Sequence, residues 1–86
     1  IAWAGNEVPV ASIEGEPRRI DRLVRLAGPA PEWWVLDYKL TASPQGDPAL
    51  RAQLAAYRDA VARLVPGEPV RAAFVTGQGE LVELQA

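Results

Sequence analysis

The sequence of 86 residues has no cysteine, no histidine and no methionine. Without cysteine the chain can form no disulfide bond and no thiolate metal site, and without histidine it has no imidazole base and no histidine-ligated zinc. No apolar run approaches the roughly 18 residues of a membrane-spanning helix, so we expect no membrane partner. The net charge of −2 argues only weakly against DNA, because acidic metal ligands would offset basic residues elsewhere.

Lysine is also scarce. Lys39 is the only lysine beside eight arginines, and it lies near the end of the apolar segment WWVLDYKL, residues 33–40. An ammonium group is a compact charge with a tunable pKa, whereas a guanidinium group is planar and effectively always protonated. A chain that otherwise uses arginine is therefore expected to keep a lysine where arginine cannot do the same chemistry.

Hydrophobic periodicity predicts one helix and five strands in the order β-β-β-α-β-β. The strands are expected over residues 7–14, 19–26, 33–40, 70–76 and 81–84, and the helix over residues 49–65. The first three strands would form an antiparallel meander, and the strand after the helix can pair in parallel with an earlier strand. We therefore predict an α+β fold, with one helix packed on a mixed β-sheet, as a single domain over residues 1–86.

The predicted helix has start and stop signals at its two ends. Asp47 is a candidate N-cap, Pro48 fits the first helical position, and Pro66 and Gly67 end the helix. One apolar stripe at spacings of three or four residues is formed by Leu50, Leu54, Tyr57, Val61 and Leu64. This stripe is the surface that we expect to pack on the sheet.

Two acidic residues are expected to meet beside the lysine. Asp37 and Lys39 are two residues apart on one strand, so they point to the same face, while Tyr38 points to the other. If residues 27–31 form the hairpin loop, Asp21 lies opposite Asp37 or within two residues of it, with Cβ atoms about 5 Å apart. Carboxylates this close repel each other unless one is protonated or a cation intervenes. Mg²⁺ or Mn²⁺ would relieve the repulsion, and Lys39 could orient or help to deprotonate a water molecule.

Three short motifs carry a resemblance to a known family. The segments RRIDRLV around Asp21, WVLDYK over 34–39 and QLAAY over 53–57 resemble those of the PD-(D/E)XK nuclease superfamily. More narrowly, they look like the C-terminal nuclease domain of RecB- and AddA-type helicase-nucleases. The resemblance spans about residues 7–85 and implies a restriction-endonuclease-like core, present here as a partial nuclease domain from a longer chain.

The resemblance implies roles for the residues around the lysine. Asp21 would be the first metal-binding carboxylate and Asp37 the second, and the backbone carbonyl of Tyr38 would be a further ligand of Mg²⁺ or Mn²⁺. Lys39 would be the catalytic lysine. Such enzymes hydrolyse phosphodiester bonds with a metal-activated water, and the metal also stabilises charge on the phosphate.

The helix motif implies two further site residues. Gln53 and Tyr57 would lie one helical turn apart, face the site, and touch the DNA backbone or support Lys39. A surface position is an equal alternative for Gln53. For Tyr57, which falls on the apolar stripe, a core position is favoured over direct contact with DNA.

The resemblance also implies a biological context. The chain would belong to a bacterial helicase-nuclease that repairs DNA double-strand breaks, acting as an exonuclease on linear DNA. The ATP-binding helicase motors would lie elsewhere in the parent protein, and a second subunit of the AddB type would be its partner. The bias toward arginine, alanine and proline is typical of a GC-rich genome, and we expect a cytoplasmic bacterial protein.

The sequence departs from the family pattern at several points. Arg18 and Leu40 replace the usual glycine before the first aspartate and the usual threonine after the lysine. The family's first motif, an acidic residue or histidine on an upstream helix, is absent, and we do not assign Glu7, expected at a strand start, to the metal. The isolated chain should therefore be a weak nuclease.

Two alternatives remain beside the active nuclease, and the simplest interpretation of Asp37 and Lys39 is a solvated ion pair of little energetic value. One alternative is a catalytically inactive nuclease-fold module for DNA binding or subunit docking, which these departures favour. The other is an unrelated small α+β interaction domain, which would place Asp21 and Asp37 on opposite faces of the sheet.

Overall fold

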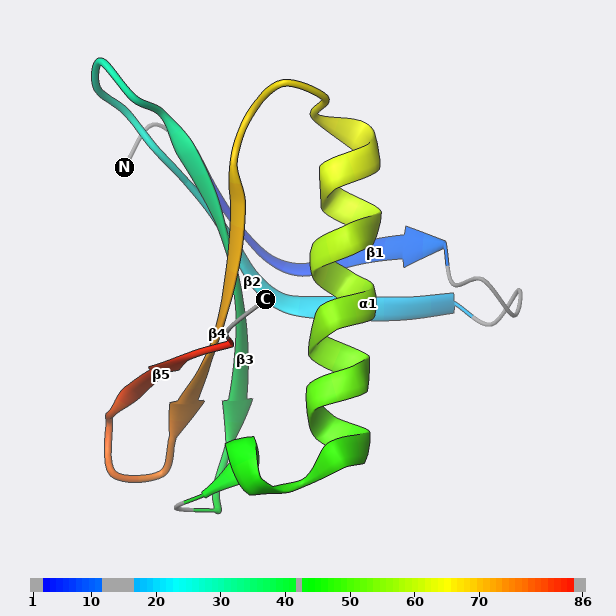
Figure 1. Ribbon diagram of the computed structural model, residues 1–86, viewed down its shortest axis with the longest axis vertical. Coiled ribbons are helices and arrows are strands. Elements are labelled where there is room, and N and C mark those ends of the chain that lie inside the picture. The colour runs from blue at the N-terminus through cyan, green and yellow to red at the C-terminus, as the bar shows by residue number, and fades with distance from the viewer. Residues whose placement is uncertain (1–2, 12–16, 42, 85–86) are drawn as a thin grey trace.

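The computed structural model describes residues 3–11, 17–41 and 43–84 (Figure 1). Its elements are β1 (Trp3–Ala11), β2 (Pro17–Leu26), β3 (Glu32–Lys39), the 3-10 helix η1 (Pro44–Gly46), α1 (Pro48–Leu64), β4 (Val70–Thr76) and β5 (Leu81–Glu83). The predicted order of strands and α-helix is confirmed, and η1 is an addition to it. The first strand begins earlier than predicted, at Trp3, and residues 12–14 of the predicted strand lie outside the described residues.

The described strands form one sheet in the order β1-β2-β3-β4-β5. The pairs β1–β2, β2–β3 and β4–β5 are antiparallel, whereas β3 and β4 are parallel. A parallel pair needs a crossover connection, and α1 supplies it by running along one face of the sheet (Figure 1). The fold is therefore the predicted α+β arrangement of one helix on a mixed sheet.

The start of α1 follows the local sequence signals. The side chain of Asp47 accepts hydrogen bonds from the backbone N–H groups of Ala49, at 2.9 Å, and Leu50, at 3.4 Å. Pro48 occupies the first helical position, where its missing N–H costs no hydrogen bond. After the helix, Gly67 takes a φ of +87°, which a residue with a side chain rarely adopts.

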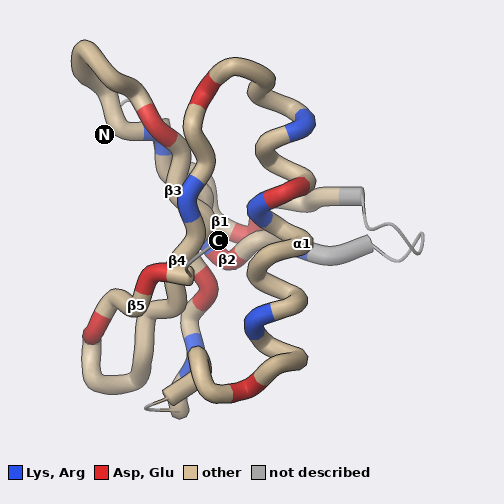
Figure 2. The backbone as a smooth tube through the Cα atoms, in the orientation of Figure 1, with Lys and Arg blue, Asp and Glu red and all other residues tan. Residues whose placement is uncertain are grey.

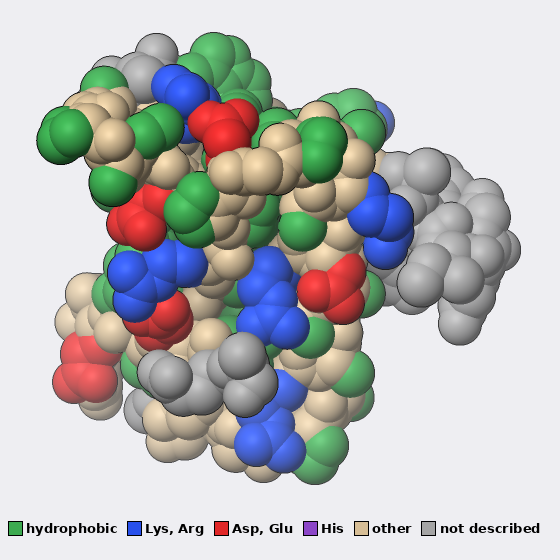
Figure 3. Space-filling view, turned by 45° about the horizontal axis from the view of Figure 1, so that its top comes forward, with side chains coloured by type: hydrophobic (Ala, Val, Ile, Leu, Met, Phe, Trp, Pro, Cys, Tyr) green, Lys and Arg blue, Asp and Glu red, His purple; other side chains and the backbone are tan. Residues whose placement is uncertain are grey.

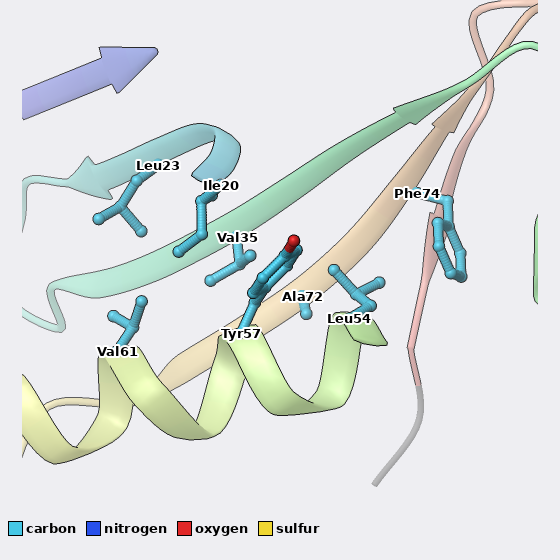
Figure 4. Packing of buried hydrophobic residues seen from close by; sticks show 8 residues of the cluster. All are labelled: Ile20, Leu23, Val35, Leu54, Tyr57, Val61, Ala72 and Phe74. Carbon is cyan, nitrogen blue, oxygen red and sulfur yellow. The ribbon is translucent and has the colours of Figure 1, made fainter. Parts of the chain in front are cut away.

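The core lies between α1 and the sheet (Figure 4). It consists of Ile20, Leu23, Val35, Leu54, Tyr57, Val61, Ala72 and Phe74. Figure 4 shows the three α1 side chains of this cluster rising toward the strands. Leu64 does not share this burial, although the spacing places it on the apolar stripe. It is 74% exposed because it is the last residue of α1, where the chain turns back toward the sheet.

The β1–β2 ribbon bends beside the predicted site. Glu7 has a φ of +50°, and the ladder pairs the residues on either side of it without pairing Glu7 with Asp21. Figure 1 shows both strands curving away from the rest of the sheet behind α1. The β2–β3 ladder stops at the same place, with Arg22 paired to Leu36. Glu7 therefore lies within β1, not at a strand start as expected, and it marks the bend.

Candidate metal and catalytic site

The hairpin of β2 and β3 brings two carboxyl groups together. Its register pairs Leu26 with Glu32 and Arg22 with Leu36, so one step further along the same register Asp21 faces Asp37. The two carboxyl groups are neighbours, close enough for Asp21 to raise the pKa of Asp37. The predicted meeting of Asp21 and Asp37 is confirmed, and the alternative that placed them on opposite faces is wrong.

Asp21 is held in place by the backbone of β3. Its Oδ2 atom accepts a hydrogen bond of 3.0 Å from the backbone N–H of Tyr38. In a continued ladder Tyr38 would pair with Ile20, but β2 leaves β3 before that point. A backbone N–H without a partner is costly, and the Asp21 carboxylate takes the place of the missing carbonyl. The bend in the ribbon thus fixes the side chain of Asp21 beside Asp37.

Asp37 is a buried carboxyl group. It is 5% exposed, and its Oδ2 atom has no hydrogen-bond partner within the part of the chain that the structure describes. Burial, together with the neighbouring Asp21 carboxyl, raises the pKa of Asp37 to about 6, while the Lys39 ammonium acts in the opposite direction. The native fold therefore holds Asp37 in surroundings that its charged form tolerates poorly.

Lys39 compensates this charge only in part. Its Nζ atom lies 3.4 Å from Oδ2 of Asp37, which is close enough for an ion pair but too loose for a well-formed hydrogen bond. The pair is more protected than a surface ion pair, since the side chain of Lys39 is 28% exposed and that of Asp37 is 7% exposed. The proposed alternative of a solvated pair does not describe this arrangement.

The donor set fits a hard divalent cation. Two convergent carboxyl groups, one with a buried oxygen that lacks a hydrogen-bond partner, are suited to Mg²⁺ or Mn²⁺. Within the described ranges, no three Asp, Glu, Cys or His residues gather in a way that could hold a metal. Asp21 and Asp37 are therefore the acidic ligands that this part of the chain can offer.

Tyr38 relates to the site through its backbone. Its side chain is 50% exposed, and it alternates with Asp37 and Lys39 along β3, so it points to the other face. Its N–H points toward Asp21, and the N–H and C=O groups of one strand residue share an edge. The carbonyl therefore also lies on the side of β2. Its role as a metal ligand stays a prediction, with this orientation in its favour.

Gln53 and Tyr57 lie one turn apart on α1, as predicted. Gln53 is half-buried, whereas Tyr57 is 8% exposed and packs in the core between α1 and β3. This burial favours the core position for Tyr57 over contact with a DNA backbone. A catalytic role for either residue stays a prediction.

The sequence did not indicate Thr76. It is buried, lies at the end of β4, and pairs in register with Lys39. No motif or spacing marks this residue, because its place beside Lys39 depends on the parallel pairing of β3 with β4. The sequence offers one clue, since the turn signals Gly77 and Gly79 follow directly after it.

The mixed sheet, its single described helix and the carboxylate-lysine group at the end of β3 define a restriction-endonuclease-like α+β core. The family model of the PD-(D/E)XK nuclease superfamily matches residues 12–84, and the chain belongs to this superfamily. Its members are generally hydrolytic nucleases that use divalent metals. No curated protein and no solved structure gives a significant match to the sequence.

Proposed function

We propose that this chain is the core of a metal-dependent nuclease domain that hydrolyses phosphodiester bonds of linear DNA. The observation that supports this proposal is the buried Asp37 carboxyl, which meets Asp21 and lies 3.4 Å from the amine of the only lysine. Desolvating two acidic groups costs stability, and a cation site is a reason to keep them together. Superfamily membership supplies the reaction class.

Each residue of the site would have a distinct role in hydrolysis. Asp21 and Asp37, with the carbonyl of Tyr38, would hold Mg²⁺ or Mn²⁺. The ion would supply activation of the attacking water and stabilisation of charge on the phosphate. Lys39 would orient the water through its ammonium N–H groups and, when neutral, accept a proton at Nζ. The hydrogen bond from the backbone of Tyr38 keeps Asp21 in position throughout.

The parent protein would be a bacterial helicase-nuclease of the AddA or RecB type that repairs double-strand breaks. The support is the set of three ordered motifs, which the structure places on β2, β3 and α1. ATP-binding motors and an AddB-type subunit would come from outside these 86 residues, and the site of action would be the bacterial cytoplasm. Among the described residues, no helix has the length and apolarity to cross a bilayer.

The surface does not by itself indicate where DNA would lie. Acidic and basic residues are spread over most of the elements (Figure 2). On the face that Figure 3 shows, basic side chains lie next to acidic ones, with no large area of one sign. DNA would therefore be positioned by specific contacts near the site and by other parts of the parent protein.

A second candidate function is a nuclease-fold module without activity, which binds DNA or docks a subunit. It is favoured by the observation that the described residues provide only two converging carboxylates. This candidate function has the same fold and the same superfamily as the first, but the module would not hydrolyse DNA.

A metal titration tests the proposed site. Millimolar Mn²⁺ should raise the melting temperature, since a ligand at ten times its Kd stabilises the fold by about 1.4 kcal/mol. Asp37→Asn should remove the shift, whereas Asp59→Asn, the same change at an exposed carboxylate of α1, should keep it. The absence of a shift in the unchanged protein would contradict the metal site.

A cleavage assay separates the two functions. With the protein in excess over linear double-stranded DNA, Mg²⁺ should support slow cleavage. Lys39→Arg should lower the rate by more than about 100-fold while the Mn²⁺ shift persists, because arginine keeps the charge but cannot release a proton. DNA binding without any cleavage would favour the inactive module. Equal rates for the variant and the unchanged protein would contradict the role of Lys39.

A further inference from the structure

The end of β3 lies against the turn between β4 and β5. Lys39 and Thr76 form the last registered pair of the parallel strands, and the next residues along each strand are Leu40 and Gly77. A Cβ atom built on Gly77 would lie 2.5 Å from the carbonyl oxygen of Leu40, 3.3 Å from its carbonyl carbon and 3.4 Å from its Cα. The backbone that follows Lys39 therefore packs directly on the backbone of Gly77.

This close approach explains why residue 77 is a glycine. The φ of Gly77 lies outside the left-handed region, so its backbone conformation does not require glycine. Space is the constraint, because only a hydrogen atom fits between Gly77 and the Leu40 carbonyl. The side chain of Leu40 is 97% exposed and cannot anchor this segment by burial. The contact with Gly77 is thus a main restraint on the backbone at the end of β3.

The turn that carries Gly77 is well braced. Thr76 Oγ1 accepts from the backbone N–H groups of Gln78, at 3.3 Å, and Glu80, at 3.2 Å. The backbone of Thr76 also donates to Glu80 O and accepts from the N–H of Gly79, each at 2.9 Å. A turn held by four hydrogen bonds cannot easily retreat. If a side chain were added at Gly77, the Leu40 segment would have to move instead.

We infer that Gly77 is a positioning residue for Lys39. By allowing the backbone after Lys39 to lie against the braced turn, it sets the direction in which the lysine side chain leaves β3. That direction brings Nζ to 3.4 Å from Asp37 Oδ2. The three heavy atoms nearest to a Cβ at Gly77 all belong to the backbone of Leu40 and not to either carboxylate, so Gly77 would act through that backbone. The catalytic consequence rests on the proposed function, whereas the positioning itself does not.

The variant Gly77→Ala should displace Lys39 without removing any ligand. Misplacing a catalytic group by about 1 Å can cost about 100-fold in rate, so kcat for DNA cleavage should fall by about 10- to 100-fold. KM for DNA and the Mn²⁺-induced melting shift should stay close to those of the unchanged protein, because Asp21 and Asp37 are untouched. The matched control is Gly46→Ala, since a Cβ at Gly46 would meet nothing within 4 Å.

The single lysine permits a direct measurement that needs no activity. Reductive methylation with ¹³C-formaldehyde labels Lys39 and the terminal amine alone, and it keeps the lysine charged. At one fixed pH, the Lys39 methyl signal of Gly77→Ala should shift toward its position in Asp37→Asn, where the carboxylate partner is missing. Gly46→Ala should leave the signal in place. An unshifted Lys39 signal in folded Gly77→Ala overturns the inference.

A second variant covers the case in which Gly77→Ala does not fold. Thr76→Val removes the hydroxyl that accepts from Gln78 and Glu80 and adds no atom near Leu40. The loosened turn should also shift the Lys39 signal, and an unchanged signal would count against the positioning role. If the unchanged protein cleaves no DNA while Gly77→Ala still moves the signal, the proposed function fails and the positioning role stands.

Discussion

Asp37 is a buried carboxyl group whose surroundings disfavour its charged form, as expected for the metal ligand that we propose. Its carboxyl is 5% exposed, next to a second carboxyl, and compensated by an ammonium that approaches only to 3.4 Å. Burial and the neighbouring carboxyl favour the protonated form, so the pKa of Asp37 is raised to about 6. Such surroundings are expected at a cation site, because a bound metal ion would supply the positive charge that the carboxyl groups lack.

The destabilising effect of burying the Asp37 carboxylate should appear in the pH dependence of stability. Because the pKa of Asp37 is raised in the folded state from 3.8 to about 6, the folded protein binds more protons than the unfolded chain in that range. The contribution of Asp37 to the free energy of unfolding therefore falls as pH rises from about 4 to about 6, by about 3 kcal/mol at most. Without metal, Asp37→Asn should be more stable than the unchanged protein at pH 7 and should lose this advantage near pH 4.

Urea unfolding at the two pH values measures the difference. The control is again Asp59→Asn, whose carboxylate is largely exposed and should show no such pH-dependent gain. A variant Asp37→Asn that is less stable than the unchanged protein at pH 7 would show that the ion pair with Lys39 outweighs the cost of burial.

At the scale of single elements, the bend in the β1–β2 ribbon shapes the site. Glu7 adopts a φ of +50°, the ladder skips it, and β2 separates from β3 next to Asp21. The separation leaves the N–H of Tyr38 for the Asp21 carboxylate. A straight β2 would use that N–H in the ladder, and Asp21 would lose its tether. Local backbone strain in β1 is thus linked to the position of Asp21, the proposed metal ligand on the next strand, β2.

Substitutions at Glu7 should reveal that strain. A non-glycine residue in the left-handed region costs about 1 kcal/mol, so Glu7→Gly should be neutral or stabilising by about that amount. Glu7→Val should destabilise the protein by about 1 kcal/mol or more, because a β-branched side chain tolerates this region poorly. Ala4→Gly, an exposed residue of the same strand, should be destabilising and serves as the control in urea titrations. Destabilisation by Glu7→Gly equal to that by Ala4→Gly would contradict strain at Glu7.

At the scale of the whole molecule, one helix covers one face of the sheet, and a polar network lies on the other. There Arg71 stacks 4.6 Å over the ring of Trp34 and forms ion pairs with Glu32 and Glu83. The Trp34 Nε1 also donates to Glu32. These contacts shield part of the uncovered face, but the main apolar cluster lies on the side of α1. Most of the folding energy must come from that small core.

Truncating a large core side chain should therefore strongly destabilise the fold. Phe74 is fully buried in the core cluster, and Phe→Ala changes in such places cost about 3–5 kcal/mol. A domain of this size has only about 4–13 kcal/mol of stability, so Phe74→Ala should lower the melting temperature strongly or unfold the chain at 37 °C. Circular dichroism melting checks this, with Leu81→Ala at a 56% exposed apolar position as the control. Similar melting temperatures for the two variants would contradict this account of the core.

Local signals were sufficient for the elements and for the hairpin register. Alternating apolar residues predicted the strands, and Asp47 with Pro48 predicted the helix start, because these preferences depend on near neighbours. The loop at residues 27–31 determines how Asp21 and Asp37 align, since register in a hairpin follows from the turn. The bend at Glu7 and the position of Leu64 outside the core had no such local signal.

The amino-acid sequence by itself thus determined which strands and helix form, and that Asp21, Asp37 and Lys39 meet on one face of a hairpin. Tertiary structure alone decided that Asp37 is buried and that Thr76 and Gly77 adjoin the end of β3. The reason is physical. Hairpin register depends on residues close in sequence, whereas burial and the β3–β4 contact arise only when α1 folds back and brings β4, some thirty residues later, against β3.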